Sequence, residues 1–113
     1  EWLVNEAVDW LQNDPDWTGG VTELMKICTL ASSFDVPLVS HGHSLLPALH
    51  IAGAQSPTTV PMVEYLLAYQ PIKQFFHRPC YEPGHGSVAL PDLPGLGLVL
   101  DDDKVVSREA VRF

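Results

Sequence analysis

The chain has few cysteines and no long apolar run, and each shortage excludes a class of protein. Its 113 residues include only two cysteines, Cys28 and Cys80, and neither belongs to a CxxC or CxxH motif. We therefore expect two separate thiols rather than a disulfide or a zinc site. No apolar stretch approaches the roughly 20 residues that cross a membrane, and the first residues lack the pattern of a signal peptide. We expect a cytoplasmic protein without a membrane partner.

Basic residues are also scarce. Six Lys and Arg residues stand against 14 Asp and Glu residues, which gives a formal charge of −8. Such an excess of negative charge opposes binding to phosphate backbones, so we expect no nucleic-acid partner. What the chain does have is apolar material: 46% of its residues are hydrophobic, enough for the core of one globular domain.

The apolar residues predict an alternation of short strands and helices over the first 70 residues. The strand candidates are continuous Val- and Leu-rich runs, which are typical of parallel strands buried on both faces. This pattern predicts an α/β fold. The predicted strands are residues 8–13, 36–42 and 62–67, and the predicted helices are residues 21–34 and a helix that Ser44 caps and that continues to Ala52.

The remainder of the chain, from residue 71 onward, has a different character. It is rich in proline and glycine and shows no amphipathic helical pattern. We expect loops and short extended pieces there, with a hairpin over residues 82–90 in which Gly84 and Gly86 supply the permissive backbone angles.

Polar residues follow two consecutive predicted strands. Asp14 ends the first and His41 ends the second, and Glu64 lies within the third. The carboxyl ends of parallel strands share one edge, about 5 Å apart, so Asp14 and His41 can touch. A carboxylate on one imidazole nitrogen leaves the other suited to proton transfer. From the residues alone, a catalytic site and ordinary strand-end turn residues are both open.

A longer motif narrows this choice. The stretch "LQNDPDWTGGVTELMKICTLASSFDVPLVSHGHS", followed by "MVEYL" and "VALPDLPGLGLVLD", resembles the carboxyl-terminal part of the enolase superfamily, mandelate racemase subgroup. The shared pattern is an Asp, then a Gly-Gly pair that opens a helix, then Ser-His at the end of the next strand. The resemblance covers roughly residues 5–104.

The resemblance implies the carboxyl-terminal βα units, about strands 6 to 8, of a TIM-like modified (β/α)8 barrel. Residues 1–70 would run from the end of helix 5 through strand 8, and residues 71–113 would form a loop and hairpin segment returning to a capping domain. The partners would be the rest of the barrel, the capping domain and further copies in a homo-oligomer. Three strands cannot close a barrel, so residues 1–113 alone should be unfolded, aggregated or partnered.

The resemblance also implies a chemistry, abstraction of the proton α to a carboxylate with the enolate stabilised on Mg²⁺. The magnesium ligands would lie on strands outside this chain. The segment "SHGHSLLPALH" resembles acid-sugar dehydratases of the rhamnonate or lyxonate kind, whose product is a 2-keto-3-deoxy acid. The roles carried over are catalytic for Asp14, His41 and Glu64. We expect substrate contacts from His43 and Trp17.

Other functions are open at this stage. A racemase or epimerase of the same superfamily would use the same residues and return the proton instead of expelling a hydroxyl. A non-catalytic fragment or interaction module would keep the pattern without the chemistry. A metal-free enzyme that used Ser44 beside Asp14 and His41 is the weakest alternative, because no GxSxG motif accompanies that serine.

Overall fold

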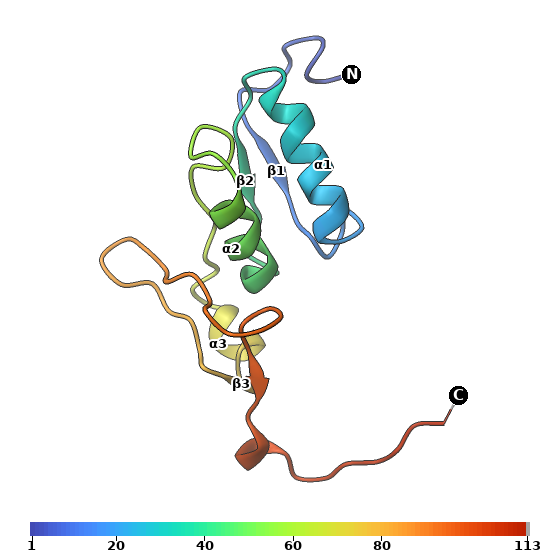
Figure 1. The fold of residues 1–113 in the computed structure, drawn as a ribbon, viewed down its shortest axis with the longest axis vertical. Coiled ribbons are helices and arrows are strands. Elements are labelled where there is room, and N and C mark those ends of the chain that lie inside the picture. Colours follow the sequence, from blue (N-terminus) through green and yellow to red (C-terminus); the bar gives the residue numbers. More distant parts are fainter. Residues whose placement is uncertain (113) are drawn as a thin grey trace.

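The computed structural model describes residues 1–112 and shows two parallel βα units at its amino-terminal end. Strand β1 (Leu11–Asn13) leads into helix α1 (Val21–Ser32), and strand β2 (Leu38–Ser40) leads into helix α2 (Leu45–Ala54). The strands pair in parallel, with Leu11 opposite Leu38 and Asn13 opposite Ser40, and lie side by side in Figure 1. The predicted α/β alternation is confirmed here, although each strand is only three residues long.

Helix α1 begins where two glycines free the chain to turn. Gly19 and Gly20 have φ of +96° and +93°, a left-handed region that side chains disfavour. The chain then enters the helix, whose buried face repeats at helical spacing through Leu24, Cys28 and Ala31.

The core forms where α1 and α2 pack on the strand pair. Its members come from both helices, from β2 and from the segment after α2. They are Leu24, Cys28, Leu38, Ile51 and Val60, all at most 4% exposed. Each large aliphatic side chain buried in this way stabilises the fold by about 1.5–3 kcal/mol. A second cluster, Leu45, Leu46, Leu49 and Tyr81, joins α2 to the later part of the chain.

The third predicted strand, residues 62–67, is wrong as a strand. The segment makes one parallel bridge, between Val63 and Ser40, and the Glu64 N–H donates to the Ser40 carbonyl at 3.1 Å. Pro61 has no N–H to extend the ladder before this point. After it the chain turns, because the Leu66 carbonyl accepts from the N–H groups of Tyr69 and Gln70. The single bridge still sets Glu64 beside the end of β2.

Beyond residue 70 the chain consists mostly of loops and short extended pieces, as predicted, with one exception. A short helix, α3 (Gln70–Lys73), was not expected, because four residues are too few to show a periodic pattern. Two short antiparallel strands also form, β3 (His77–Arg78) and β4 (Val99–Leu100), and a 3₁₀ turn, η1 (Asp102–Lys104), follows them.

The predicted hairpin over residues 82–90 is reduced to a tight turn. Its only pairing is a bridge between Gly84 and Ser87, with Gly86 at a φ of +82°. Of the segment expected at residues 71–113, Phe113 lies outside the described residues.

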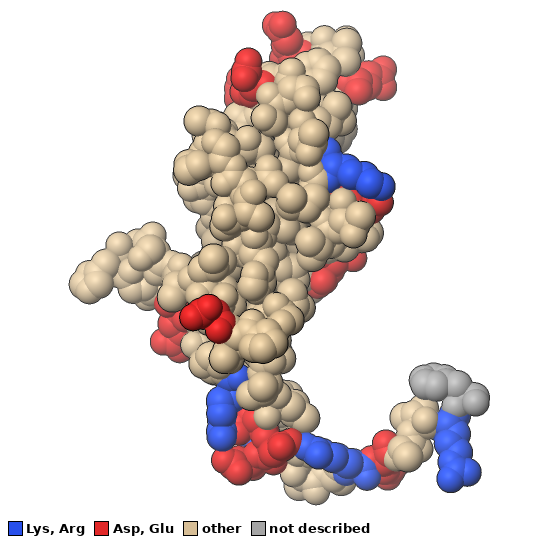
Figure 2. Space-filling view, viewed as in Figure 1, with Lys and Arg blue, Asp and Glu red and all other residues tan. Residues whose placement is uncertain are grey.

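The surface combines scattered charge with much exposed apolar area. In Figure 2 the broad upper part of this face is largely uncharged, and charged side chains lie along its margins and on the lower part of the molecule. Trp2, Trp17, Leu67 and Ile72 are each at least 69% exposed. Within residues 1–112, no helix is both long and apolar enough to cross a membrane.

Candidate active site

Asp14 begins a turn directly after β1 and is almost fully buried, at 2% exposure. Its Oδ1 accepts the backbone N–H of Asp16 at 2.8 Å, an Asx turn that suits the Asp-Pro sequence at this point. Its carbonyl accepts from the N–H and the hydroxyl of Thr18, at 3.0 and 2.8 Å. The carboxylate is therefore held by its own backbone turn, and Oδ2 is left to face outward from the strand end.

His41 meets that free oxygen. The ladder of β1 and β2 continues for one more bond, from the His41 N–H to the Asn13 carbonyl at 2.9 Å. This brings the His41 Nδ1 within 3.3 Å of the Asp14 Oδ2, so the contact predicted from the strand ends is present. An ionised carboxylate only accepts hydrogen bonds, so Nδ1 carries the hydrogen. Nε2 is then the ring nitrogen available for proton exchange.

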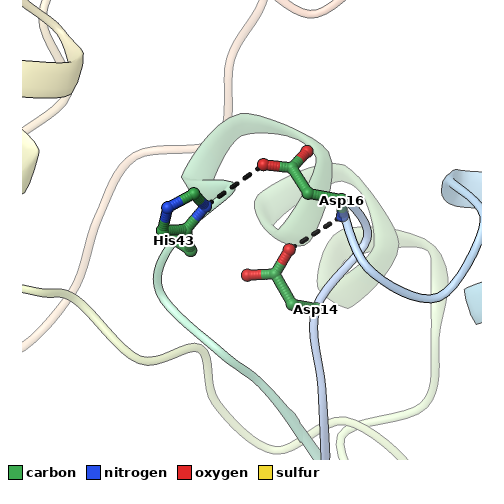
Figure 3. Close-up of side chains that lie close together, drawn as sticks. All are labelled: Asp14, Asp16 and His43. Carbon is green, nitrogen blue, oxygen red and sulfur yellow. Dashed lines mark hydrogen bonds and ion pairs between the residues drawn. The ribbon is translucent and has the colours of Figure 1, made fainter.

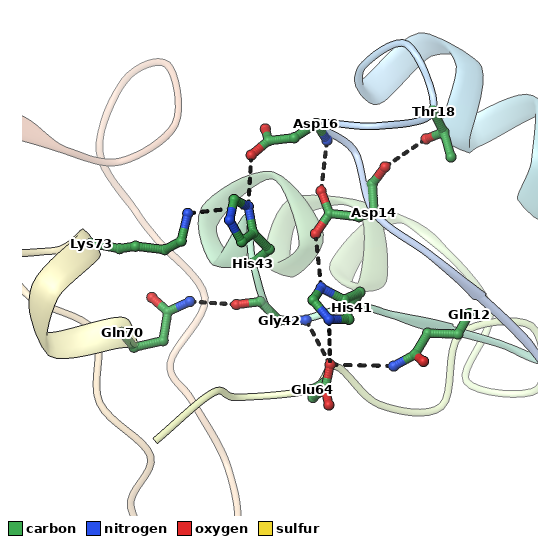
Figure 4. A network of polar contacts seen from close by, with 10 residues as sticks. All are labelled: Gln12, Asp14, Asp16, Thr18, His41, Gly42, His43, Glu64, Gln70 and Lys73. Atoms are coloured by element: carbon green, nitrogen blue, oxygen red, sulfur yellow. Dashed lines mark hydrogen bonds and ion pairs between the residues drawn. The ribbon is translucent and has the colours of Figure 1, made fainter. Parts of the chain in front are cut away.

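Glu64 lies on the other side of the same imidazole. Its Oε2 is 3.7 Å from the His41 Nε2, and it accepts the Gly42 N–H at 3.0 Å and the Gln12 amide at 3.3 Å (Figure 4). Gly42 permits this approach, because a Cβ at that position would lie 2.5 Å from the Glu64 carbonyl oxygen. The three predicted catalytic residues therefore converge from three separate segments.

Trp17 covers the two histidines that follow β2. Its ring centroid lies 5.6 Å from that of His41, in a stacked arrangement, and 5.5 Å from that of His43. The indole is 72% exposed, so it stands over the site rather than in the core. The structure thus places both residues predicted to contact substrate beside the Asp14–His41 pair.

Two residues of this region were not predicted, Asp16 and Lys73. The His43 Nδ1 lies 3.2 Å from the Asp16 Oδ2 and 3.1 Å from the Lys73 Nζ. Ser44, His43 and Lys73 together lower the pKa of Asp16 below its ordinary value, against the opposing effect of burial, and the Ser44 hydroxyl contributes most. Ser44 thus acts on Asp16.

Asp16 could have been found from spacing. It precedes His43 by 27 residues, the same separation as between Asp14 and His41. Lys73 carries no comparable signal, because it comes from a segment that the sequence assigns to loops.

Asp14, Asp16 and His43 have ligand atoms within 4.8 Å of one another (Figure 3), but they suit Mg²⁺ poorly. Mg²⁺ favours oxygen ligands in octahedral geometry. Here one donor is an imidazole nitrogen, and the Lys73 ammonium lies 3.1 Å from that same atom. Both Asp14 oxygens already accept hydrogen bonds. These residues therefore do not form a magnesium site.

Comparison with known protein families gives one match. The sequence model of the family described as "Enolase C-terminal domain-like" matches residues 1–104. This match includes every residue of the site just described.

Several curated proteins are similar to the chain. The arabinonate dehydratase of Saccharolobus solfataricus is 35% identical over 106 residues, which are 90% of this chain and 28% of that protein. The D-galactarolactone cycloisomerase of Agrobacterium fabrum is 36% identical, over 86% of this chain and 28% of that protein. The L-rhamnonate dehydratase of Saccharopolyspora erythraea is 32% identical, over 88% and 26%. The chain thus spans little more than a quarter of these relatives.

Solved structures agree on the fold. A provisionally assigned dehydratase from Salmonella enterica matches with a TM-score of 0.76 and 29% identity, over 90% of this chain and 26% of that one. A provisionally assigned L-alanine-DL-glutamate epimerase from Burkholderia xenovorans matches with a TM-score of 0.70 and 25% identity, over 90% and 26%.

Proposed function

The chain belongs to the enolase C-terminal domain-like family, and from this premise we propose that the protein carrying it is an acid-sugar dehydratase. Two of the similar curated proteins are dehydratases, of arabinonate and of L-rhamnonate. The observation that supports the proposal most is the contact of the buried Asp14 carboxylate with the His41 imidazole at 3.3 Å. We assign catalytic roles to Asp14, His41 and Glu64, and substrate contacts to His43 and Trp17.

His41 is the proton-exchanging group of this proposal. Asp14 keeps the hydrogen on Nδ1, so Nε2 is the nitrogen that can take up a proton and deliver it to a leaving group. The Trp17 ring stacks beside the imidazole, with the two ring centroids 5.6 Å apart. His41 is 29% exposed at its side chain, so a substrate can reach Nε2 from the open side.

The reaction removes one water from the sugar acid. The proton on the carbon α to the carboxylate is taken by a base, and the C–H electron pair becomes the enolate. Those electrons then form the bond between the α and β carbons while the β C–O bond breaks. His41 gives its Nε2 proton to the departing oxygen, which leaves as water. The resulting enol becomes the 2-keto-3-deoxy acid when its β carbon gains a proton and its enol hydroxyl loses one.

Glu64 borders the space in front of Nε2. Its Oε2 lies 3.7 Å from that nitrogen, longer than a hydrogen bond, and is held by the Gly42 N–H and the Gln12 amide. A substrate hydroxyl in this space could contact both groups. We propose that Glu64 orients the hydroxyl that leaves.

We further propose that the protein is magnesium-dependent. Enolase superfamily members typically bind Mg²⁺, but Asp14, Asp16 and His43 do not fit that ion. The ligands would therefore lie outside residues 1–112. When bound, Mg²⁺ would offset the negative charge that builds on the substrate carboxylate.

The same premise supports a placement of the chain in a larger assembly. We propose that residues 1–70 form the end of helix 5 through strand 8 of a modified (β/α)8 barrel, and that residues 71–113 return to a capping domain. The proposed partners are those other parts, a sugar acid and further copies of the protein, without nucleic acid or membrane. The proposed location is cytoplasmic, where sugar acids are catabolised.

A racemase or epimerase is the second candidate, supported by the similarity to an assigned epimerase at a TM-score of 0.70. Both reactions begin with loss of the α proton, and only the dehydratase expels a hydroxyl. A non-catalytic interaction module would do neither.

One experiment separates the three. The full-length protein is incubated with Mg²⁺ and a panel of sugar acids in D₂O, and 2-keto-3-deoxy products and deuterium at the α carbon are both measured. We expect a 2-keto-3-deoxy product from at least one sugar acid. Deuterium uptake without loss of water would favour the racemase. If no sugar acid gives either a 2-keto-3-deoxy product or deuterium uptake, the proposal that the protein is an enzyme is contradicted.

A further inference from the structure

A second carboxylate–imidazole pair stands beside the first. Asp16 Oδ2 lies 3.2 Å from the His43 Nδ1, and Asp14 Oδ2 lies 3.3 Å from the His41 Nδ1, both across 27 residues (Figure 4). The separation equals the register of the strand pair, in which Asn13 lies opposite Ser40, although Asp16 itself lies in the turn after β1. The two rings lie 6.4 Å apart and share Trp17 as a neighbour.

The second pair differs from the first by its cation. The Lys73 Nζ lies 3.1 Å from the same His43 Nδ1 that faces Asp16. One nitrogen cannot accept from Lys73 and donate to Asp16 at once. If Nδ1 accepts from Lys73, the opposite nitrogen Nε2 carries the hydrogen and donates. If Nδ1 donates to Asp16, Nε2 accepts.

Such a ring suits a hydroxyl ligand. A hydroxyl group can both donate and accept, so it finds a partner on Nε2 in either arrangement. The groups are also reachable, with His43 35% and Asp16 49% exposed at their side chains. The ion pairs found within residues 1–112 do not include Lys73, so no carboxylate is in direct contact with its ammonium.

Space for a ligand adjoins these residues. A cavity of about 300 Å³ is lined by Asp16, His43, Ser44 and Lys73, with Leu45 and Leu96 among its apolar walls. Among the residues of the two pairs, Asp16 and His43 line it and Asp14 and His41 do not. The His43 ring lies 6.4 Å from that of His41, so a chain of hydroxyl-bearing carbons that reacts at His41 has this distance to span.

We propose that Asp16, His43 and Lys73 form a second hydroxyl-binding site, which holds the part of the sugar acid beyond the reacting carbons and thereby selects among substrates. The inference rests on the proposed dehydratase function. His43 contacts the substrate, and Asp16 and Lys73 are positioning residues that act through its ring. Because Nδ1 can either accept from Lys73 or donate to Asp16, Nε2 can either donate to a substrate hydroxyl or accept from it.

The test compares Lys73→Met with Lys26→Met in the full-length protein. Lys26 is a matched control, because it is exposed on α1 and pairs only with Glu23, at 2.6 Å. Sugar acids of four, five and six carbons are assayed with each variant, and Lys73→Arg tests rescue. Thermal melting checks that each variant folds. If Lys73→Met does not fold, His43→Gln is assayed in its place.

For Lys73→Met we expect KM for the longer sugar acids to rise roughly tenfold, with kcat changed less than about threefold. The four-carbon acid should be little affected, and Lys73→Arg should recover part of the loss. Imidazole ¹⁵N shifts should also show that His43 moves to the form with the hydrogen on Nδ1, which a purely structural role would not produce.

The outcomes distinguish the two proposals. If the wild-type protein dehydrates a sugar acid and Lys73→Met and His43→Gln keep its KM for every chain length, the second hydroxyl-binding site is wrong and the dehydratase stands. If the wild-type protein acts on no sugar acid, both proposals fail together.

Discussion

At the scale of single residues, the two neighbouring aspartates have opposite environments and therefore different uses. Asp14 is 2% exposed, with one oxygen on the backbone and the other on His41. Hydrogen bonds in such a dry setting are stronger than in water, and the carboxylate has no freedom to turn away. The Asp16 side chain is 49% exposed, so water and a ligand can both reach it.

The fixed Asp14 carboxylate predicts the effect of Asp14→Asn. The amide keeps the shape but removes the negative charge beside the His41 ring, and its NH₂ can face Nδ1 where an acceptor stood. We expect kcat to fall about 10²–10⁴-fold. Steady-state kinetics of the full-length protein measures this, and a kcat equal to that of the wild type would show that Asp14 does not act on His41.

Asp16 predicts a pH effect on stability. Its pKa is lowered below 3.8 in the fold, so its charged form stabilises the native state above about pH 4. That contribution is lost as pH falls through the folded-state pKa. Between pH 5 and pH 3, wild type should lose more unfolding free energy than Asp16→Asn, by under about 1 kcal/mol because the group is half exposed. Urea titrations at both pH values measure this, and equal losses would refute it.

Sequence patterns could predict the Asp14–His41 contact because it depends only on which ends of parallel strands meet. The same reasoning covers Asp16 and His43, which repeat the 27-residue separation. Lys73 could not be predicted, since its position depends on how α3 packs after a proline-rich segment. Contacts that depend on strand pairing can be predicted from the sequence, and contacts that depend on loop packing cannot.

At the scale of elements, the site depends on a close crossing of two chain segments. The end of β2 and the segment carrying Glu64 touch at Gly42, whose N–H donates to the Glu64 carboxylate and whose carbonyl accepts from the buried Gln70. The sequence predicted a full strand here, and the structure holds a single bridge. The proposed function requires only that bridge, because it sets Glu64 opposite His41.

The crossing predicts that Gly42→Ala is damaging. Its Cβ would lie 2.5 Å from the Glu64 carbonyl oxygen, which is backbone and cannot move alone. We expect a loss of about 1–3 kcal/mol in unfolding free energy and a loss of turnover, because Glu64 is pushed from His41. Urea denaturation of the full-length protein measures the unfolding free energy, and steady-state kinetics measures turnover.

Gly84→Ala is the matched control. A Cβ there meets nothing within 4 Å, so stability and turnover should be unchanged. Equal effects of the two substitutions, or none from either, would show that the crossing at Gly42 is not tight.

At the scale of the whole molecule, residues 1–112 bury too little of their apolar surface to explain a stable monomer. Large apolar side chains are exposed on many elements, including Trp10 and Leu30 at 50% and 53%. Each strand pair is short. Within residues 1–112 no further strand pairs with the outer edge of β1, and the outer edge of β2 bonds only to the irregular segment of residues 59–64. These surfaces fit the proposed contacts with further barrel strands.

The exposed surface predicts the behaviour of residues 1–113 expressed alone. We expect the isolated chain to be unfolded or to self-associate, because apolar area of this extent is rarely left open on a soluble monomer. Sedimentation and thermal melting at several concentrations measure it. A sharp melting transition of a monomer, independent of concentration, would contradict the prediction.

The central claim is that His41 exchanges a proton with the substrate, and its most direct test is the turnover of His41→Asn in the full-length protein. His85→Asn is the control, since His85 lies in the exposed turn of residues 84–87 at a φ of 53° that asparagine tolerates. We predict that His41→Asn lowers kcat at least about 100-fold while calorimetry shows substrate affinity within about threefold of wild type. A His41→Asn protein that dehydrates its sugar acid at the wild-type rate would contradict the claim.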